Sequence, residues 1–80
     1  MIVKILGPGC TNCKNLEKAT REALDSLGLE AEVEEVRDYA AIAGYGVMAT
    51  PGLVVDDQVL VSGRVPKAAE IRELLAAAAS

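Results

Sequence analysis

Apolar residues follow helical spacing in some stretches of the chain and strand spacing in others, and this predicts an order of elements. Ile2 to Leu6 is a short apolar run interrupted only by Lys4 and closed by a Gly-Pro-Gly sequence, so we expect a buried central strand. From Thr11 to Leu27 the apolar positions recur at helical spacing, and Gly28 is placed to end this helix. The positions expected to face the core are Leu16, Ala19, Ala23, Leu24 and Leu27. The charged residues expected on the outer face are Lys14, Glu17, Lys18, Arg21, Glu22 and Asp25.

The middle of the chain predicts an exposed strand and a short helix. Apolar residues at 29, 31 and 33 alternate with glutamates at 30, 32 and 34, a period of two that is typical of a strand with one wet face. So many charges suit the edge of a sheet. Asp38 can cap a short helix that continues to about Ala43, and a glycine-containing loop follows.

The last third of the chain predicts a hairpin and a final helix. The β-branched runs Leu53–Val55 and Val59–Val61 flank Asp56-Asp57-Gln58, the pattern of an antiparallel hairpin. Pro66 suits the first turn of a helix. The inner stripe of that helix is Ile71, Leu74, Leu75 and Ala78. The order β-α-β-α-β-β-α, with a right-handed crossover between the first two strands, predicts an α/β fold with a four-stranded mixed sheet and helices on both faces.

Length and charge narrow the classes of function. Eighty residues, 51% of them apolar and 25% charged, fit one small folded domain spanning residues 1–80. A net charge of -4 and scattered Lys and Arg argue against a nucleic-acid surface. The apolar start is too short for a signal peptide or a membrane span, so we expect a cytoplasmic protein with no membrane partner. We also expect it to be a monomer. The chain has no histidine, which excludes a Cys/His catalytic pair.

Two cysteines three positions apart, Cys10 and Cys13, follow the first strand and open the first helix. In a reducing compartment this Cys-x-x-Cys spacing points to redox or soft-metal chemistry rather than to a structural disulfide, because the loop it closes is small. Free backbone amides and the helix dipole stabilise a thiolate on Cys10, which makes it the attacking sulfur. Cys13, one helical turn later, lies deeper and can resolve a mixed disulfide formed on Cys10.

A second feature is the Thr50-Pro51 pair, which directly precedes a β-branched strand. Taken alone, such a proline is compatible with an ordinary trans peptide bond at the start of a strand. Together with an upstream Cys-x-x-Cys at a strand-to-helix turn, it suggests a cis proline that faces the cysteines. The backbone of Thr50 would then be open to pair with an extended segment of a substrate.

These features resemble the thioredoxin and glutaredoxin superfamily, in particular its small redox-active disulfide proteins, over nearly all of the chain. The matching segments are GPGCTNCKNLEK (7–18), YGVMATPGLVVD (45–56) and SGRVPKAAEIRELL (62–75). The resemblance implies a thioredoxin-like fold and a thiol-disulfide oxidoreductase, with Cys10 as nucleophile, Cys13 as resolving cysteine and Pro51 as the cis proline. It implies no bound cofactor beyond a redox-active Cys10–Cys13 disulfide. The implied partners are disulfide-containing client proteins and a flavoprotein or dithiol reductase.

The chain also departs from the family pattern. Gly9 stands where thioredoxin has a tryptophan, and Thr11-Asn12 replaces Gly-Pro between the cysteines. Lys4 stands six residues before Cys10, where thioredoxin keeps a buried acid. Its ammonium either lies inert at the sheet rim, the interpretation we favour, or stabilises a thiolate near Cys13. The residues predicted to contact a substrate are Gly9, Thr11, Tyr45, Met48, Thr50 and Pro51.

A soft-metal module is the alternative function for the same two cysteines. Heavy-metal-associated domains also place a Cys-x-x-Cys between a first strand and a helix. Their element order is βαββαβ, with the hairpin in the middle and no proline opposite the cysteines, whereas this chain places its hairpin late. Zinc or copper(I) binding stays open at this point, and zinc held by four thiolates of a dimer would block the redox role.

Overall fold

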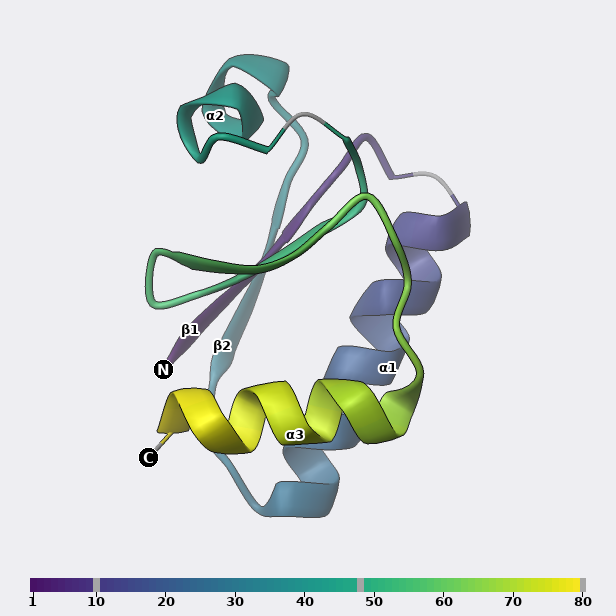
Figure 1. Cartoon of the computed structure of the whole chain (residues 1–80), viewed down its shortest axis with the longest axis vertical. Coiled ribbons are helices and arrows are strands. Elements are labelled where there is room, and N and C mark those ends of the chain that lie inside the picture. Colours follow the sequence, from purple (N-terminus) through teal and green to yellow (C-terminus); the bar gives the residue numbers. More distant parts are fainter. Residues whose placement is uncertain (10, 48, 80) are drawn as a thin grey trace.

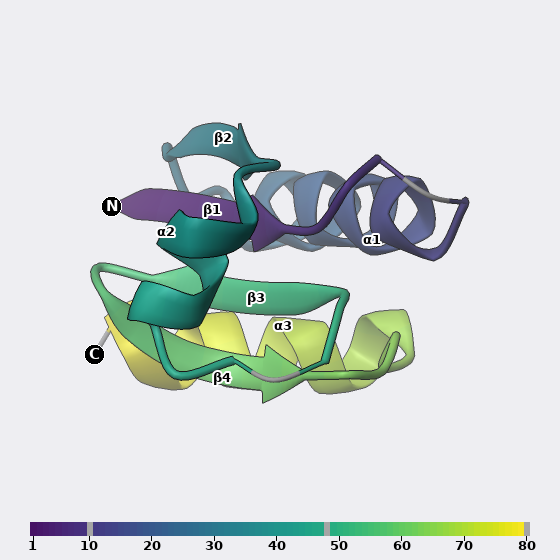
Figure 2. The same ribbon diagram turned by 90° about the horizontal axis from the view of Figure 1, so that it is seen from above.

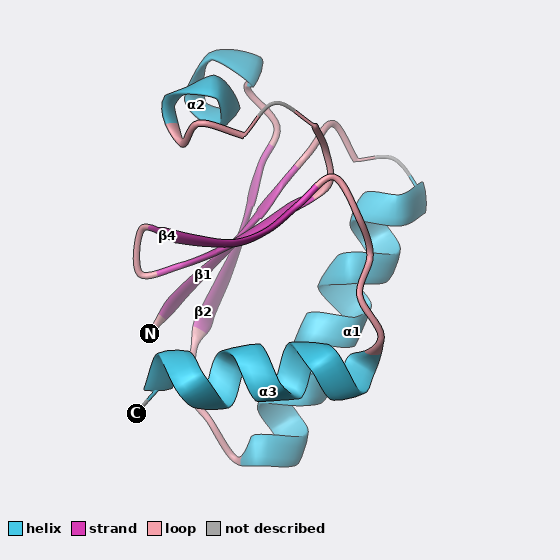
Figure 3. Cartoon of the chain, in the orientation of Figure 1, coloured by secondary structure: helices cyan, strands magenta, loops and turns pink. Residues whose placement is uncertain are grey.

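A computed structural model of the chain describes residues 1–9, 11–47 and 49–79. The elements follow one another in the order expected from the sequence (Figure 3). They are β1 (Ile2–Leu6), α1 (Thr11–Leu27), β2 (Glu32–Val36), α2 (Tyr39–Gly44), β3 (Gly52–Val55), β4 (Gln58–Ser62) and α3 (Ala68–Ala79). The predicted α/β class and element order are therefore confirmed.

The four strands form one mixed sheet in the order β2-β1-β3-β4. β1 runs parallel to β2 and antiparallel to β3, and β3 runs antiparallel to β4. The apolar first strand thus lies inside the sheet, while the glutamate-rich second strand forms an edge, as predicted. The C-terminal end of β1 and the start of α1 lie at the end of the sheet away from the N-terminus (Figure 1).

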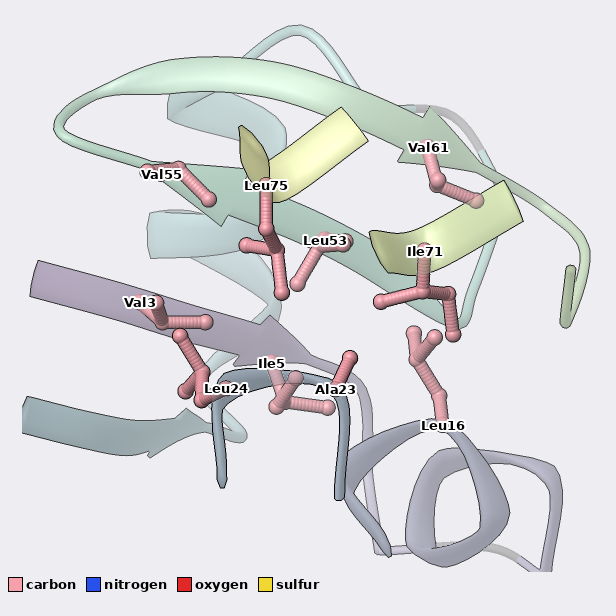
Figure 4. Close-up of a cluster of buried hydrophobic side chains, with 10 residues drawn as sticks. All are labelled: Val3, Ile5, Leu16, Ala23, Leu24, Leu53, Val55, Val61, Ile71 and Leu75. Atoms are coloured by element: carbon pink, nitrogen blue, oxygen red, sulfur yellow. The ribbon is translucent and has the colours of Figure 1, made fainter. Parts of the chain in front are cut away.

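Helices cover both faces of the sheet, but unequally. α1 and α3 pack on one face, called here the α1/α3 face, and the short α2 lies on the other, the α2 face (Figures 1 and 2). The buried side chains of the α1/α3 face are Val3, Ile5, Leu16, Ala23, Leu24, Leu53, Val55, Val61, Ile71 and Leu75 (Figure 4). The buried side chains of the α2 face are Leu6, Ile42, Val47 and Val54. Most of the core therefore lies under α1 and α3.

α1 has the predicted bounds, and its inner stripe differs from the prediction at two positions. Gly28 ends the helix with a φ of 67°, a conformation in which glycine carries no Cβ penalty. Leu27 was expected in the core and is exposed, because it lies in the last turn where the chain leaves the helix. Thr20 is buried instead, and its hydroxyl donates a hydrogen bond to the carbonyl oxygen of Leu16 at 2.7 Å. None of the described helices is long and apolar enough to cross a membrane.

Other boundaries shift by a few residues. β2 begins at Glu32, later than the alternating pattern suggested, because its pairing with β1 starts at Ile2. α3 begins at Ala68, two residues after Pro66. The carbonyl of Lys67 accepts the hydrogen bond from the Ile71 amide, so the helix starts after Lys67 and the buried Pro66 precedes it.

The β3–β4 hairpin closes with a two-residue turn. Asp56 and Asp57 have φ values of 47° and 68°, the left-handed pair that a tight hairpin turn requires. Gln58 belongs to β4 rather than to the turn. Asp56 also anchors the start of β1: its Oδ1 accepts from the amide of Ile2 at 2.8 Å, and its amide donates to the Ile2 carbonyl at 2.9 Å.

Candidate functional site

Cys13 lies in the first turn of α1, where its side chain is buried. The loop after β1 makes room for it at Gly7. A Cβ at Gly7 would overlap the Cys13 Sγ, and it would lie 3.7 Å from the Cβ of Thr50. Gly7, Cys13 and Thr50 therefore meet at one place, although they come from different segments of the chain. Cys10 lies outside the described residues.

The Thr50–Pro51 peptide bond is cis. Pro51 is buried and Thr50 is partly exposed. The Pro51 carbonyl accepts a hydrogen bond from the amide of Gly63 at 2.8 Å, and a Cβ on Gly63 would lie only 2.9 Å from the Cβ of Ala49. The end of β4 thus packs directly on the segment that brings Thr50 to Cys13.

Gly9 and Thr11 lie on either side of the Cys10 position. Gly9 adopts a φ of 87°, and a Cβ there would lie 3.4 Å from the guanidinium carbon of Arg37. Arg37 therefore lies over the loop in the space that a side chain at position 9 would need. Thr11 is the exposed first residue of α1. Both residues are close in sequence to the buried Cys13 thiol, and their contact with a substrate stays a prediction.

A small cavity of about 10 Å³ lies beside Cys13. Roughly one water fits in a space of this size. Its walls come from β1 and the loop after it, from the first turn of α1, and from the end of β2. The lining residues are Ile5, Gly7, Gly9, Cys13, Lys14, Glu35 and Arg37.

Two glutamates and two arginines connect α1 to β2 near this cavity. Arg37 Nη2 lies 2.7 Å from Glu35 Oε2, and Arg21 Nε lies 3.8 Å from Glu17 Oε2. Glu17 and Glu35 hydrogen-bond to each other, and this bond raises the pKa of Glu17, with desolvation as a smaller cause. The hydrogen bond from Arg37, followed by the bond with Glu17, lowers the pKa of Glu35. Glu35 therefore loses its proton at lower pH than Glu17 does.

The pattern of charges along the chain did not predict this carboxyl pair. Glu17 was expected on the solvent face of the helix, and neither Glu35 nor Arg37 was expected at the site. A signal was present, because Glu34 and Glu35 are consecutive and interrupt the alternation of the strand. Two neighbours on a strand point to opposite faces, so one of them has to face α1.

Lys4 has its partners on the α2 face, away from the helix that carries Cys13. Its Nζ donates to the Tyr45 hydroxyl at 2.7 Å, and Asp57 Oδ1 lies at 3.9 Å. The hydrogen bond to Tyr45 is the main cause that raises the pKa of Lys4, and the charges of Asp57 and Glu34 add to it. The neighbours of Lys4 therefore agree with the interpretation that it plays no part in thiolate stabilisation.

The predicted substrate contacts are only partly brought together. Tyr45 packs against the α2-face cluster and accepts the Lys4 hydrogen bond, so its contact with a substrate stays a prediction. Met48 lies outside the described residues. Among residues 1–9, 11–47 and 49–79, no three Cys, Asp or Glu side chains gather as a metal site. The site therefore combines the buried thiol of Cys13 with the partly exposed segment at Thr50.

The chain is similar to known proteins over most of its length. Residues 1–76 match the family model described as a thioredoxin domain. A thioredoxin of Methanothermobacter thermautotrophicus is 43% identical over 75 residues, which cover 94% of this chain and 97% of that protein. A thioredoxin of Methanocaldococcus jannaschii is 35% identical over 75 residues, which cover 94% of this chain and 86% of that protein.

Proposed function

Because the chain belongs to the thioredoxin family, whose members are thiol-disulfide oxidoreductases, we propose that Cys10 and Cys13 form its redox pair. The Cys10 thiolate attacks a disulfide of a client protein, which forms a mixed disulfide and releases one client thiolate. Cys13 then attacks the Cys10 sulfur and releases the second client thiolate. The client gains two electrons, and the Cys10–Cys13 pair is left as a disulfide.

The position of Cys13 supports this proposal most directly. Its buried Sγ fits against Gly7, and the Thr50 side chain lies on the other side of that glycine. Thr50 is partly exposed, so its backbone is available to an extended client segment that brings a disulfide to the cysteines. A buried sulfur one turn into the helix suits the second attack better than the first, because a client has to reach the attacking sulfur from solvent.

Several finer points belong to the same proposal. Electrons pass between sulfur atoms, so the reaction needs no organic cofactor. A flavoprotein or dithiol reductase returns the pair to the dithiol form. We further propose that the chain acts as a monomer in the cytoplasm and that residues 1–80 work as one domain.

Trapping of clients tests the assigned roles. Cys13→Ser is expected to accumulate client proteins as mixed disulfides on Cys10, because the second attack is removed. The matched control, Cys10→Ser, keeps a thiol but removes the first attack and is expected to trap none. Adducts are counted on non-reducing gels and mapped by mass spectrometry. Equal trapping by the two variants would contradict the order of attack.

The metal alternative is tested on the wild-type chain. Equilibration with thiol-disulfide buffers is expected to give a two-electron transition with an intramolecular disulfide. Failure to form that disulfide, together with stoichiometric zinc or copper(I) binding, would reject the redox proposal in favour of a metal module.

A further inference from the structure

A charged hydrogen bond connects the middle of β1 to the loop that leads to the cis proline. It joins the ammonium of Lys4 to the hydroxyl of Tyr45 at 2.7 Å, a short distance that is typical of a charged donor. We propose that Lys4 and Tyr45 are positioning residues, which hold segment 45–50 in the conformation that an extended client pairs with at Thr50. This inference rests on the client contact proposed above for Thr50, and it adds that Lys4 acts on the affinity for clients rather than on the thiols.

Lys4 is a rigid starting point for this bond, because its backbone lies in a central strand. Lys4 pairs with Glu34 on β2 and with Val54 on β3. Its side chain is only 24% exposed, and Asp57 Oδ1 lies 3.9 Å from the ammonium. The position of the ammonium is therefore determined by the sheet, and Tyr45 is held against it.

Tyr45 passes this restraint on to the backbone at the end of α2. Its amide donates to the Ile42 carbonyl at 3.1 Å, and the amide of Gly46 donates to the Ala43 carbonyl at 2.9 Å. The Tyr45 ring packs against the α2-face cluster. A tyrosine side chain has only two rotatable bonds, so fixing its ring and its hydroxyl also fixes the backbone at position 45.

The other end of segment 45–50 is attached to the end of β4. A Cβ on Gly63 would lie 2.9 Å from the Cβ of Ala49, and the Gly63 amide donates to the Pro51 carbonyl at 2.8 Å. Between the two attachments lies Gly46, whose φ of 77° turns the chain away from α2. Loss of the attachment at Tyr45 therefore releases one end of the segment, and Thr50 can take up more positions.

A client binds less tightly when its binding surface is in the competent conformation for only part of the time. The apparent dissociation constant rises in inverse proportion to the population of that conformation. The reaction of the sulfur atoms should not change, because the hydrogen bond lies on the α2 face and Cys13 belongs to α1 on the other face. Loss of the bond should therefore raise the concentration needed for half saturation and leave the limiting rate as it is.

Two disulfides of different length test this separation. The first is an extended synthetic peptide disulfide with a fluorophore and a quencher on its two arms, which separate on reduction. The second is a symmetric aromatic disulfide that releases a coloured thiolate and is too short to lie along segment 45–50. Reduced full-length protein in excess is mixed with each disulfide, and the rate is followed over a range of protein concentrations.

The variants remove one partner of the bond at a time. Lys4→Met and Tyr45→Phe are each expected to raise the half-saturating concentration for the peptide about fivefold, as when the competent population falls to about one fifth. The double variant should give the same rise as either single one, because both remove the same bond. The limiting rate with the peptide and the rate with the aromatic disulfide should stay at their wild-type values. The matched control is Tyr39→Phe, which removes a hydroxyl from a 66% exposed tyrosine of the same helix and should behave as wild type.

Amide hydrogen exchange reports on the segment directly. In Lys4→Met the Gly46 amide is expected to exchange about fivefold faster, because the turn at the end of α2 opens more often. The Ile71 amide, which donates to the Lys67 carbonyl at the start of α3, should exchange as in wild type. Equally faster exchange at both amides would mean a general loss of stability and would overturn the positioning role.

Other outcomes also decide against the proposal. An unchanged half-saturating concentration in Lys4→Met would overturn it, and a rise in Tyr45→Phe alone would show that the Tyr45 hydroxyl contacts the client itself. Equal slowing with both disulfides would show that the bond only supports the fold. In all these cases the wild type still reduces both disulfides, so the redox role stands. A wild type that reduces neither disulfide would instead reject the redox pair.

Discussion

The two faces of the sheet are built differently, and each carries its own polar cluster. The α1/α3 face buries most of the core and has the Glu17–Glu35–Arg37 cluster beside Cys13. The α2 face buries a smaller cluster and has Lys4 hydrogen-bonded to Tyr45. Each cluster contains a charged residue from a strand, Lys4 from β1 and Glu35 from β2, and these two strands are neighbours in the sheet. What decides whether such a charge can act on the thiol is the face to which its side chain points.

The largest expected effect tests whether the α1/α3 face contributes more to the free energy of unfolding than the α2 face does. Ile71→Ala, on α3, is expected to lower the free energy of unfolding by about 3–5 kcal/mol, because the cavity it leaves is enclosed by packed neighbours. Ile42→Ala removes the same atoms from the α2 face and is expected to cost about 2 kcal/mol, because the six-residue α2 can move inward. Chemical denaturation measures both. Equal losses would show that the faces contribute alike.

A second variant tests the close packing at the thiol. Gly7→Ala places a methyl group on the Cys13 Sγ and is expected to destabilise the fold by about 1–3 kcal/mol, as overpacking does. It should also slow the resolution of the mixed disulfide, because Cys13 has to move. Gly44→Ala is the control, since a Cβ at Gly44 meets no atom within 4 Å. If Gly7→Ala proves as stable and active as the control, the described packing is wrong.

A third variant tests whether the α2 face is isolated from the thiol. Lys4→Met removes the ammonium that Tyr45 binds and is expected to lower the melting temperature slightly. The pKa of Cys13, measured in a Cys10→Ser background, is expected to stay unchanged. A fall or rise of that pKa by about one unit would mean that the ammonium acts across the sheet.

The smallest expected effect is a pH dependence of stability. Because the pKa of Glu17 is raised in the folded state, its contribution is present at acid pH and is lost as pH rises through that raised pKa. Glutamine cannot ionise, so Glu17→Gln avoids the repulsion from Glu35. The melting temperature of Glu17→Gln minus that of wild type should therefore increase between about pH 4 and about pH 7. Glu22→Gln, on the exposed side of the same helix, serves as control, and a difference that is flat with pH would contradict the raised pKa of Glu17.

The sequence predicted the elements, because these depend on local patterns. Helical spacing and Gly28 defined α1, and the late hairpin with its β-branched runs defined β3 and β4. The apolar first strand and the glutamate-rich second one correctly indicated the centre and the edge of the sheet.

The sequence could not predict the contacts that depend on register. Whether Glu35 or Glu34 faces α1 is decided by how β2 pairs with β1, and a slip of one residue would exchange them. The hydrogen bond of Lys4 could not be predicted either, because its partner Tyr45 becomes a neighbour only when α2 folds over the sheet. The neighbourhood of a titratable group is a tertiary property, and the Glu17–Glu35 pair appears only when α1 is docked on the strand.

The pairing of β1 with β3 has a consequence for the synthesis of the chain. Val3 lies opposite Val55, and the last helix supplies Ile71 and Leu75 to the same core. A growing chain can pair β1 with β2 and form α1 early, but that layer keeps an uncovered apolar face until the C-terminal segments arrive. We therefore expect stable folding only after nearly the whole chain has been made, so that C-terminal truncations are lost to degradation rather than accumulating as folded fragments.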